Sequence, residues 1–231
     1  MSTSEPEPSL IEPGKRGIPL TYVVALVPVA AALNIVAGAI GTALRLPVFL
    51  DMIGTAVVAI TIGPWWGALV GVITNVGTAT MINPVSLPFA AANVAGALIW
   101  GYGVRFGMGR TVLRFFILSL IVALGVTITA VPIYVFVFGG ATGHFADMMT
   151  AAFLAAGAQL VGAVFMSNII VSVADKVFSA FVALAIVEAL PKNLQVTGDL
   201  IESETMTRVL IITGGVVLGV ILIVVAMLIG V

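Results

Sequence analysis

Apolar runs follow one another along most of this 231-residue chain, and several are long enough to cross a lipid bilayer. Hydrophobic residues make up 61% of the sequence and charged residues only 8%, whereas soluble domains carry about 25% charged residues. Because a soluble protein of this composition could not cover its surface with polar groups, most of the chain must have lipid as its solvent. We therefore predict an all-α, polytopic protein that crosses the cell membrane several times.

The composition also excludes several function classes. The net charge of −1 argues against nucleic acid as a partner, since phosphates require clustered Lys and Arg. The chain has no cysteine, one histidine and no GxxxxGK[ST] motif, so neither a Cys-based metal site nor ATP hydrolysis by that route is expected. Serines are few and none has the histidine near it in sequence. We predict a protein that is not an enzyme, with no catalytic residue, no metal and no cofactor.

The expected organisation has four parts. Residues 1–17 are a polar, Pro-containing stretch and are predicted to be a disordered cytoplasmic tail. A transmembrane core covers 18–191, a polar linker covers 192–207, and an additional transmembrane helix covers 208–231. Within the core, spans are expected at 18–43, 49–62, 67–82, 89–104, 115–138 and 177–190. Basic residues at positions 15, 16, 105, 110 and 114 place the N-terminus and the 105–114 loop in the cytoplasm.

The segment 148–173 allows two topologies. It is apolar enough to cross the bilayer, and Asp175-Lys176 then separates it from the run 177–190. If both runs cross, Lys176 is cytoplasmic; if only the second crosses fully, 148–173 caps the outer half of the protein. The charge count favours the second topology. Asp175-Lys176 is then a self-neutralising pair at membrane depth, and an ordinary boundary pair is the alternative.

The stretch 46–93 carries the clearest sign of a binding site. Its two apolar runs, 49–62 and 67–82, fall below the ~20 residues usual for a crossing, which indicates helices packed inside the protein. Asp51, Asn83 and Asn93 lie in or beside these runs, as does Asn75. Polar groups among apolar residues are costly unless they pair with one another or line a site.

Further candidate residues come from other segments. Arg45 is expected in an outer loop, where it either pairs with Asp51 or binds an anionic ligand. His144 lies in a Gly-rich loop that is either a lid or simply solvated. Gln159, Asn168 and Asp175 complete the predicted substrate-binding set of Arg45, Asp51, Asn83, Asn93, His144, Gln159, Asn168 and Asp175. Since amides both donate and accept hydrogen bonds, they suit an uncharged or zwitterionic heterocycle or a sugar-like solute.

Three motifs carry a family resemblance. The motifs are LPVFLDMIGT at 46–55, GPWWGALVGVITN at 63–75 and NPVSLPFAAAN at 83–93, and Asp175-Lys176 precedes a helix ending in Leu190-Pro191-Lys192. Together they resemble the membrane S components of energy-coupling factor (ECF) transporters. The resemblance implies a core of six helices with a substrate pocket in its outer half, closed by the loops between helices one and two, three and four, and five and six. It also implies two kinds of partner, a membrane coupling subunit and two cytoplasmic ATPases. Small residues near Ala39 and Ala43 provide either internal packing or a docking face for that subunit.

The function predicted from the sequence is substrate binding for vitamin uptake. We expect the substrate-binding S component of an ATP-driven ECF transporter, with an S-component-like six-helix core plus one additional C-terminal transmembrane helix, for a vitamin or related small micronutrient. The alternatives are a membrane sensor or scaffold subunit that binds a signalling partner, and a stand-alone secondary carrier that uses Asp51 as its proton site.

Overall fold

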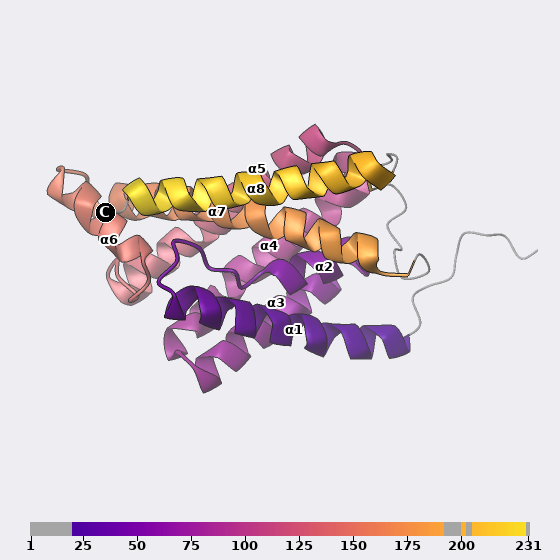
Figure 1. The fold of residues 1–231 in the computed structure, drawn as a ribbon. Helices are drawn as coiled ribbons and strands as arrows, with labels where there is room; N and C mark the ends of the chain where they lie inside the picture. Colours follow the sequence, from indigo (N-terminus) through magenta and orange to yellow (C-terminus); the bar gives the residue numbers. More distant parts are fainter. Residues whose placement is uncertain (1–19, 192–199, 202–204, 230–231) are drawn as a thin grey trace, which may run out of the picture.

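The computed structural model describes residues 20–191, 200–201 and 205–229, and these residues form helices without any strand. The α-helices are α1 (Leu20–Ala43), α2 (Ile53–Thr61), α3 (Pro64–Met81), α4 (Ala90–Gly103), α5 (Val112–Pro132), α6 (Ala146–Ala155), α7 (Leu160–Ala189) and α8 (Thr205–Ile229). Shorter helical segments are η1 (Pro84–Phe89), η2 (Val104–Met108) and η3 (Ile133–Val137) (Figure 1). The predicted all-α class is thus confirmed for the described chain. The predicted tail 1–17 and most of the predicted linker 192–207 lie outside the described residues.

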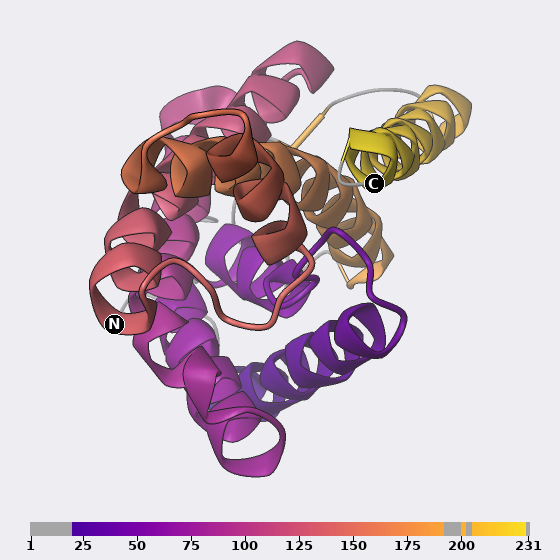
Figure 2. The ribbon, with the colours of Figure 1, turned by 90° about the vertical axis from the view of Figure 1, so that its left-hand side faces the viewer.

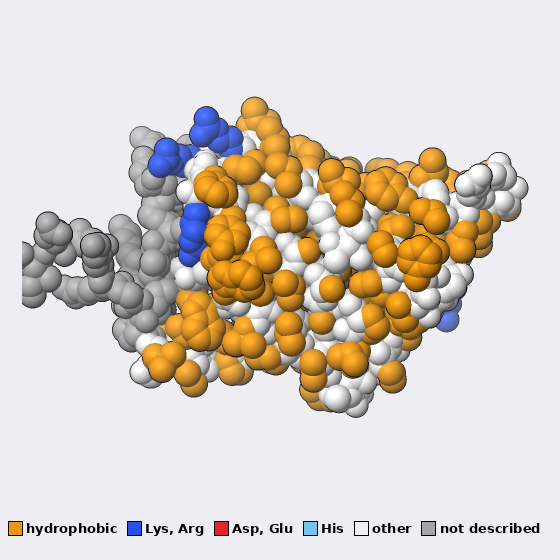
Figure 3. Space-filling model, turned by 180° about the vertical axis from the view of Figure 1, so that it is seen from behind, with side chains coloured by type: hydrophobic (Ala, Val, Ile, Leu, Met, Phe, Trp, Pro, Cys, Tyr) orange, Lys and Arg blue, Asp and Glu red, His pale blue; other side chains and the backbone are white. Residues whose placement is uncertain are grey.

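Five of the described helices are long and apolar enough to cross a membrane: Leu20–Ala43, Pro84–Met108, Val112–Val137, Leu160–Ala189 and Met206–Ile229. Hydrophobic side chains dominate the face shown in Figure 3, and Lys and Arg side chains gather toward one end of it. The chain therefore has the architecture of a helical, multi-pass membrane protein. The expected count of six core helices plus one is not reached by this criterion, because α2 has only 9 residues and α3, with 18, is not among the five.

Helix α2 lies at the centre of the bundle, in contact with α1, α3, α4 and α7 (Figure 2). All its residues are buried, as expected for a helix that is apolar on every side. Gly54 permits the close approach of α1, since a Cβ at this position would overlap the backbone of Ala30. The helix begins at Ile53, later than the predicted 49, because Leu50 has a φ of 55° and interrupts helical geometry.

The turn between α2 and α3 is held by the end of α4. Pro64 is in the first turn of α3, where its missing N–H costs no hydrogen bond. The Arg105 guanidinium donates to the carbonyl oxygens of Ala59 (3.2 Å), Gly101 (2.8 Å) and Ile62 (3.3 Å). The Ala59 and Ile62 carbonyls lie at the end of α2, where the last carbonyls of a helix have no partner within it, so Arg105 caps α2 from a neighbouring helix.

The region after α5 corrects the sequence-based boundaries. A short helix, α6, ends at Ala155, and Gly157 with a φ of 93° breaks the chain before α7 starts at Leu160. Helix α7 then continues for 30 residues straight through Asp175 and Lys176. The expected single segment 148–173 with a break at Asp175-Lys176 was therefore wrong. The charged pair does not end the helix because it is buried inside the protein and neutralises itself.

Helix α8 lies on the outside of the bundle along α7 (Figures 1 and 2). Two glycines make the contact close: Gly215 faces the ring of Phe181, and a Cβ on Gly219 would come within 2.7 Å of the Phe178 Cα. At the start of α8, Arg208 pairs with Glu188 of α7 across 2.7 Å.

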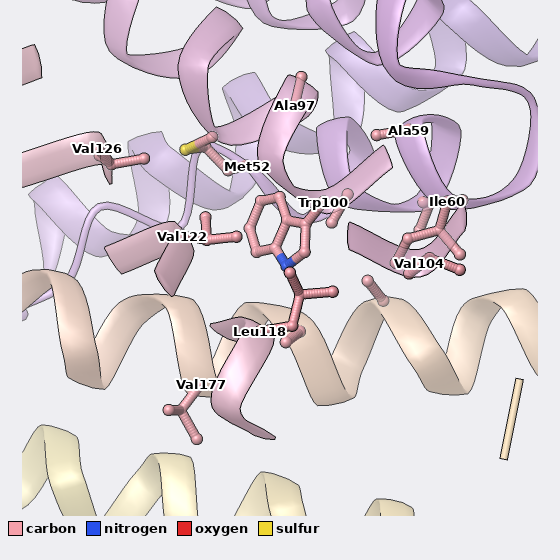
Figure 4. Packing of buried hydrophobic residues seen from close by; sticks show 14 of the residues in the cluster. Met52, Ala59, Ile60, Ala97, Trp100, Val104, Leu118, Val122, Val126 and Val177 are labelled. Atoms are coloured by element: carbon pink, nitrogen blue, oxygen red, sulfur yellow. The ribbon is translucent and has the colours of Figure 1, made fainter. Parts of the chain in front are cut away.

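The main hydrophobic core is built around Trp100 of α4. Its indole is fully buried and lies close to Met52, Leu118 and Val122 (Figure 4). The same cluster includes Val177 of α7, so it joins α2, α4, α5 and α7. This core fills the middle of the bundle and leaves the end where α1 and α3 terminate for the cavity described next.

Candidate solute-binding cavity

A cavity of about 180 Å³ lies where α1, α3 and α5 end and α4 and α7 begin. A single water needs only ~10–15 Å³ of such space, so a small organic solute has room here. The connections 44–52 and 139–145 and the segment η1 form its rim. Its polar lining residues are Asn34, Thr42, Asp51, Asn75, Thr78, Asn83, Ser86, Asn93, Tyr134, Thr142, His144, Asn168 and Lys176. Its apolar walls include Phe49, Met52, Phe89 and Val126.

A chain of hydrogen bonds crosses the buried side of this cavity. The backbone N–H of Gly54 donates to Asn34 Oδ1, at 2.6 Å, and Asn34 Nδ2 donates to the hydroxyls of Thr55 (2.9 Å) and Thr74 (3.0 Å). The Thr55 hydroxyl donates to Asn93 Oδ1 over 3.4 Å, and Asn93 Nδ2 donates to Asp51 Oδ2 over 3.0 Å. The side chains of Asn34, Thr55, Thr74 and Asn93 are at least 98% buried. These hydrogen bonds therefore supply the partners that buried polar groups require.

Lys176 and Asp175 form a buried ion pair beside Asp51. Lys176 Nζ donates to Asp175 Oδ2, and both side chains are almost inaccessible to solvent. The other carboxylate oxygen, Oδ1, accepts the backbone N–H of Leu50 at 2.8 Å. The Lys176 ammonium also lies 5.7 Å from the centre of the Phe49 ring. The pair therefore fixes the connection 44–52, which carries Asp51, against α7.

His144 joins the two connections at the rim. Its ring stacks on Phe49 with centroids 4.4 Å apart, its Nδ1 accepts the Ala146 N–H at 3.2 Å, and its Nε2 lies 3.4 Å from the Val48 carbonyl. Because Nδ1 is an acceptor, the proton belongs on Nε2, which then donates to Val48. Burial lowers the pKa of His144, against the opposing effects of the Val48 carbonyl and the charges of Asp147 and Asp175. The neutral imidazole is thus the form that fits this arrangement.

Asp147 and Asn75 order other parts of the rim. Asp147 Oδ2 accepts the backbone N–H groups of Thr142 (2.8 Å) and Gly143 (2.6 Å). Asn75 accepts the Ser86 hydroxyl at 3.0 Å and donates to the Gly71 carbonyl at 2.9 Å. Asn83 accepts the Val85 N–H at 3.1 Å, which starts η1.

Five of the eight predicted site residues line the cavity: Asp51, Asn83, Asn93, His144 and Asn168. Asp175 lies behind the lining, bonded to Lys176. Arg45 and Gln159 are exposed and lie outside the lining. Among the described residues Arg45 forms no ion pair, and Asp51 is bonded by Asn93 instead of the predicted Arg45.

Several lining residues were not among the predicted set, notably Asn34, Asn75, Tyr134 and Lys176. Asn34 and Asn75 share the signal that singled out Asn93, an amide within an apolar run. Lys176 was seen only as the partner of Asp175. Tyr134 gave no signal, because an aromatic residue in a transmembrane run is ordinarily core.

The chemistry offered by these residues is binding. Within the described part of the chain, no group of three or more His, Asp or Glu side chains converges as a metal site would require. The polar groups are mainly amides and hydroxyls, and Asn168 Oδ1 is buried without a partner in hydrogen-bonding geometry among the described residues, with the Tyr134 hydroxyl nearby. An unpaired acceptor in a cavity is available to a ligand.

Comparisons of the chain with protein-family models, with curated proteins and with solved structures give no match.

Proposed function

We propose that this chain is the substrate-binding membrane subunit of an ATP-driven importer of the ECF type, with a vitamin or a related small micronutrient as its substrate. The observation that carries this proposal is the cavity, whose polar lining consists mainly of amides and hydroxyls, with the amides of Asn34, Asn93 and Asn168 among those that are buried. Pockets that combine apolar walls with a few placed polar groups are typical of small-molecule binding sites.

The distribution of basic residues supports an outward-facing cavity. Three arginines, Arg105, Arg110 and Arg114, lie between the end of α4 and the first turn of α5. The cavity is at the opposite ends of these two helices, where the start of α4 and the end of α5 contribute to its lining. By the positive-inside rule the arginine end faces the cytoplasm, together with the start of α1. A solute would then enter from outside the cell, and the coupling subunit and two ATPases would supply the energy from the cytoplasmic side.

Ligand analysis of the purified protein tests this function. A solute that copurifies can be released and identified by mass spectrometry, and its affinity measured by calorimetry in detergent or nanodiscs. We expect Asn93→Ala to weaken binding about tenfold or more, since a buried donor to Asp51 is lost. Gln159→Ala is the matched control, because this amide is exposed and outside the cavity. The proposal fails if no vitamin-like or nucleobase-like solute binds more tightly than about 1 mM.

A stand-alone carrier is the second candidate, favoured by the half-buried Asp51 and the buried pair Asp175 and Lys176. Embedded carboxylates of this kind serve as proton sites in secondary transporters. Copurification and reconstitution separate the two candidates. Association with ATPase subunits and ATP-dependent uptake support the importer, whereas solute uptake by proteoliposomes containing this chain alone supports the carrier.

A further inference from the structure

The charges around the cavity do not balance. Two carboxylates, Asp51 and Asp175, face a single ammonium, that of Lys176, and Lys176 is bonded to Asp175. Burial raises the pKa of Asp51 and so favours its neutral form in the empty cavity; Lys176 attracts the ionised form at longer range, and Asp175 repels it. The remaining titratable residues of the lining are His144, held neutral, and Tyr134. Asp51, when ionised, thus lacks a cation of its own, and a positive charge beside it would favour its ionised form.

The hydrogen-bond chain favours the ionised form of Asp51. Its direction is fixed at the start, because the Gly54 N–H can only donate, which makes Asn34 Oδ1 the acceptor and Asn34 Nδ2 the donor. Donation then passes through Thr55 to Asn93 and ends at Asp51 Oδ2. Every step points toward Asp51, and hydrogen bonds donated to a carboxyl group stabilise its charged form. Aligned donors of this kind also polarise one another.

The walls around Asp51 suit an organic cation. Phe49, Phe89 and Tyr134 line the cavity, and Phe89 and Tyr134 lie with their ring centroids 4.8 Å apart. The negative faces of aromatic rings attract cations within about 6 Å. The protein already uses Phe49 in this way, with the Lys176 ammonium near its ring. Aromatic rings in the lining, together with a carboxyl group that lacks a cation of its own, favour a flat or compact cation over a neutral molecule of the same shape.

We propose that the cavity takes a small organic cation, either a protonated amine or a positively charged ring, with its charge next to Asp51. This inference rests on the proposed binding function and narrows its substrate class. It differs from the uncharged or zwitterionic solute that the amides alone suggest, because it takes the carboxyl group of Asp51 into account. The ligand cation completes the charge balance, so that the cavity holds two carboxylates and two positive charges when occupied.

Matched pairs of probes that differ in charge test the inference. Binding of 1-methylnicotinamide is compared with that of nicotinamide, and benzylamine with benzyl alcohol, by thermal shift and calorimetry on the purified full chain at pH 7. We expect each cation to bind about tenfold or more tightly than its neutral partner. Asp51→Asn removes this preference, whereas Asp51→Glu, which retains the charge, and the exposed control Gln159→Ala keep it. If Asp51→Asn does not fold, the probe pairs on the unaltered protein decide.

The outcomes separate this inference from the proposed function. Neutral partners that bind as tightly as the cations, or a preference that survives in Asp51→Asn, overturn the inference and leave the cavity as a binding site. If none of the four probes binds, the charge at pH 7 of a copurified solute decides: a cation supports the inference, and a neutral or anionic solute overturns it. If there is neither probe binding nor a copurified solute, the proposed function fails and the inference fails with it.

Discussion

Asp175, in the middle of α7, accepts the backbone N–H of Leu50 through Oδ1 at a distance of 2.8 Å. Leu50 has a φ of 55°, an unfavourable region for a residue with a branched side chain. The same carboxylate holds Lys176 through its other oxygen. One buried ion pair therefore maintains both the strained turn that positions Asp51 and the wall of the cavity, and this arrangement leads to the first prediction.

Removing either partner of the pair will destabilise the protein. Asp175→Asn removes the carboxylate bonded to the Lys176 ammonium and leaves only the longer-range attraction of Asp51, and Lys176→Met leaves Asp175 buried without a counter-charge, so each is expected to cost about 3–5 kcal/mol. The double variant should lose less than the sum of the two, because neither member of the Asp175–Lys176 pair is left behind without the other. Unfolding by SDS or by heat in one detergent measures all three. The control is Glu188→Gln, which breaks the more exposed pair with Arg208 and should cost ~1 kcal/mol or less. Strictly additive losses in the double variant would contradict the interpretation.

Asn34 is expected to be required for both folding and binding. Asn34→Leu keeps the volume but leaves the Gly54 N–H and the Thr55 and Thr74 hydroxyls without their buried partner, at an expected cost of about 1–3 kcal/mol for each unsatisfied group. It also removes the donor that orients Thr55 toward Asn93, so solute affinity should fall as well. Thermal unfolding and calorimetry on the same samples measure the two effects, with Gln159→Leu as the exposed control. Unchanged stability in Asn34→Leu would show that the hydrogen-bond chain is dispensable.

Gly54 should not tolerate a side chain. Its Cβ would overlap the backbone of Ala30, which cannot move without separating α1 from α2. We expect Gly54→Ala to destabilise the protein by at least ~1–3 kcal/mol, measured as a lowered unfolding temperature. Gly162→Ala is the matched control within α7, since a Cβ there meets open space, and it should be neutral or slightly stabilising. Equal effects of the two substitutions would argue against close packing of α1 on α2.

The stability of the protein should fall as the pH is lowered below neutrality, in part through His144. Burial lowers the pKa of His144, while the unfolded chain takes up this proton near pH ~6.5. The unfolded state therefore binds more protons in the range between the two pKa values, and folding stability is lost as the pH falls through that range. Protonation of Nδ1 also removes the acceptor for the Ala146 N–H. The groups facing the ring include Asp147 and Asp175, whose charges moderate the effect.

Unfolding temperatures measured between pH 7.5 and 5.5 test this assignment, at buffer values spanning the ~6.5 of an ordinary histidine. In His144→Gln the decrease should be smaller than in the unaltered protein, because the titrating group is absent. An identical decrease in both would assign the pH dependence to other groups.

The sequence predicted the helices that face lipid better than those that face protein. Apolar length alone locates α1, which the structure begins at Leu20 and ends at Ala43 against an expected 18–43. It also indicated that the short runs around α2 and α3 pack inside the protein. This is confirmed for α2, which is wholly buried, and wrong for α3, which exposes Leu69, Val72 and Val76. These successes share one physical cause, since the burial of apolar surface and the length of a helix can both be read from neighbouring residues.

The predicted boundaries of α6 and α7 were wrong because they depend on contacts between distant parts of the chain. Asp175-Lys176 suggested a boundary because charges are costly in lipid, and only the fold shows that the pair is enclosed by protein. The actual break at Gly157 gave little signal in a chain with 25 glycines. In the candidate site, Asp51 and Asn93 were recognisable as polar groups in apolar sequence, but their bond joins positions 42 residues apart. Such pairings depend on tertiary packing, which no local pattern encodes.

The position of α8 restricts how another membrane protein could approach this one. Because α8 lies along α7, with Gly215 and Gly219 against Phe181 and Phe178, an incoming subunit would have to displace a closely packed helix to touch that flank. Within the described residues helix α1 has no such cover: Val24, Val29 and Val36 each expose more than half of their surface. Another membrane protein can therefore approach more easily along α1, which is exposed, than along α7, which α8 covers.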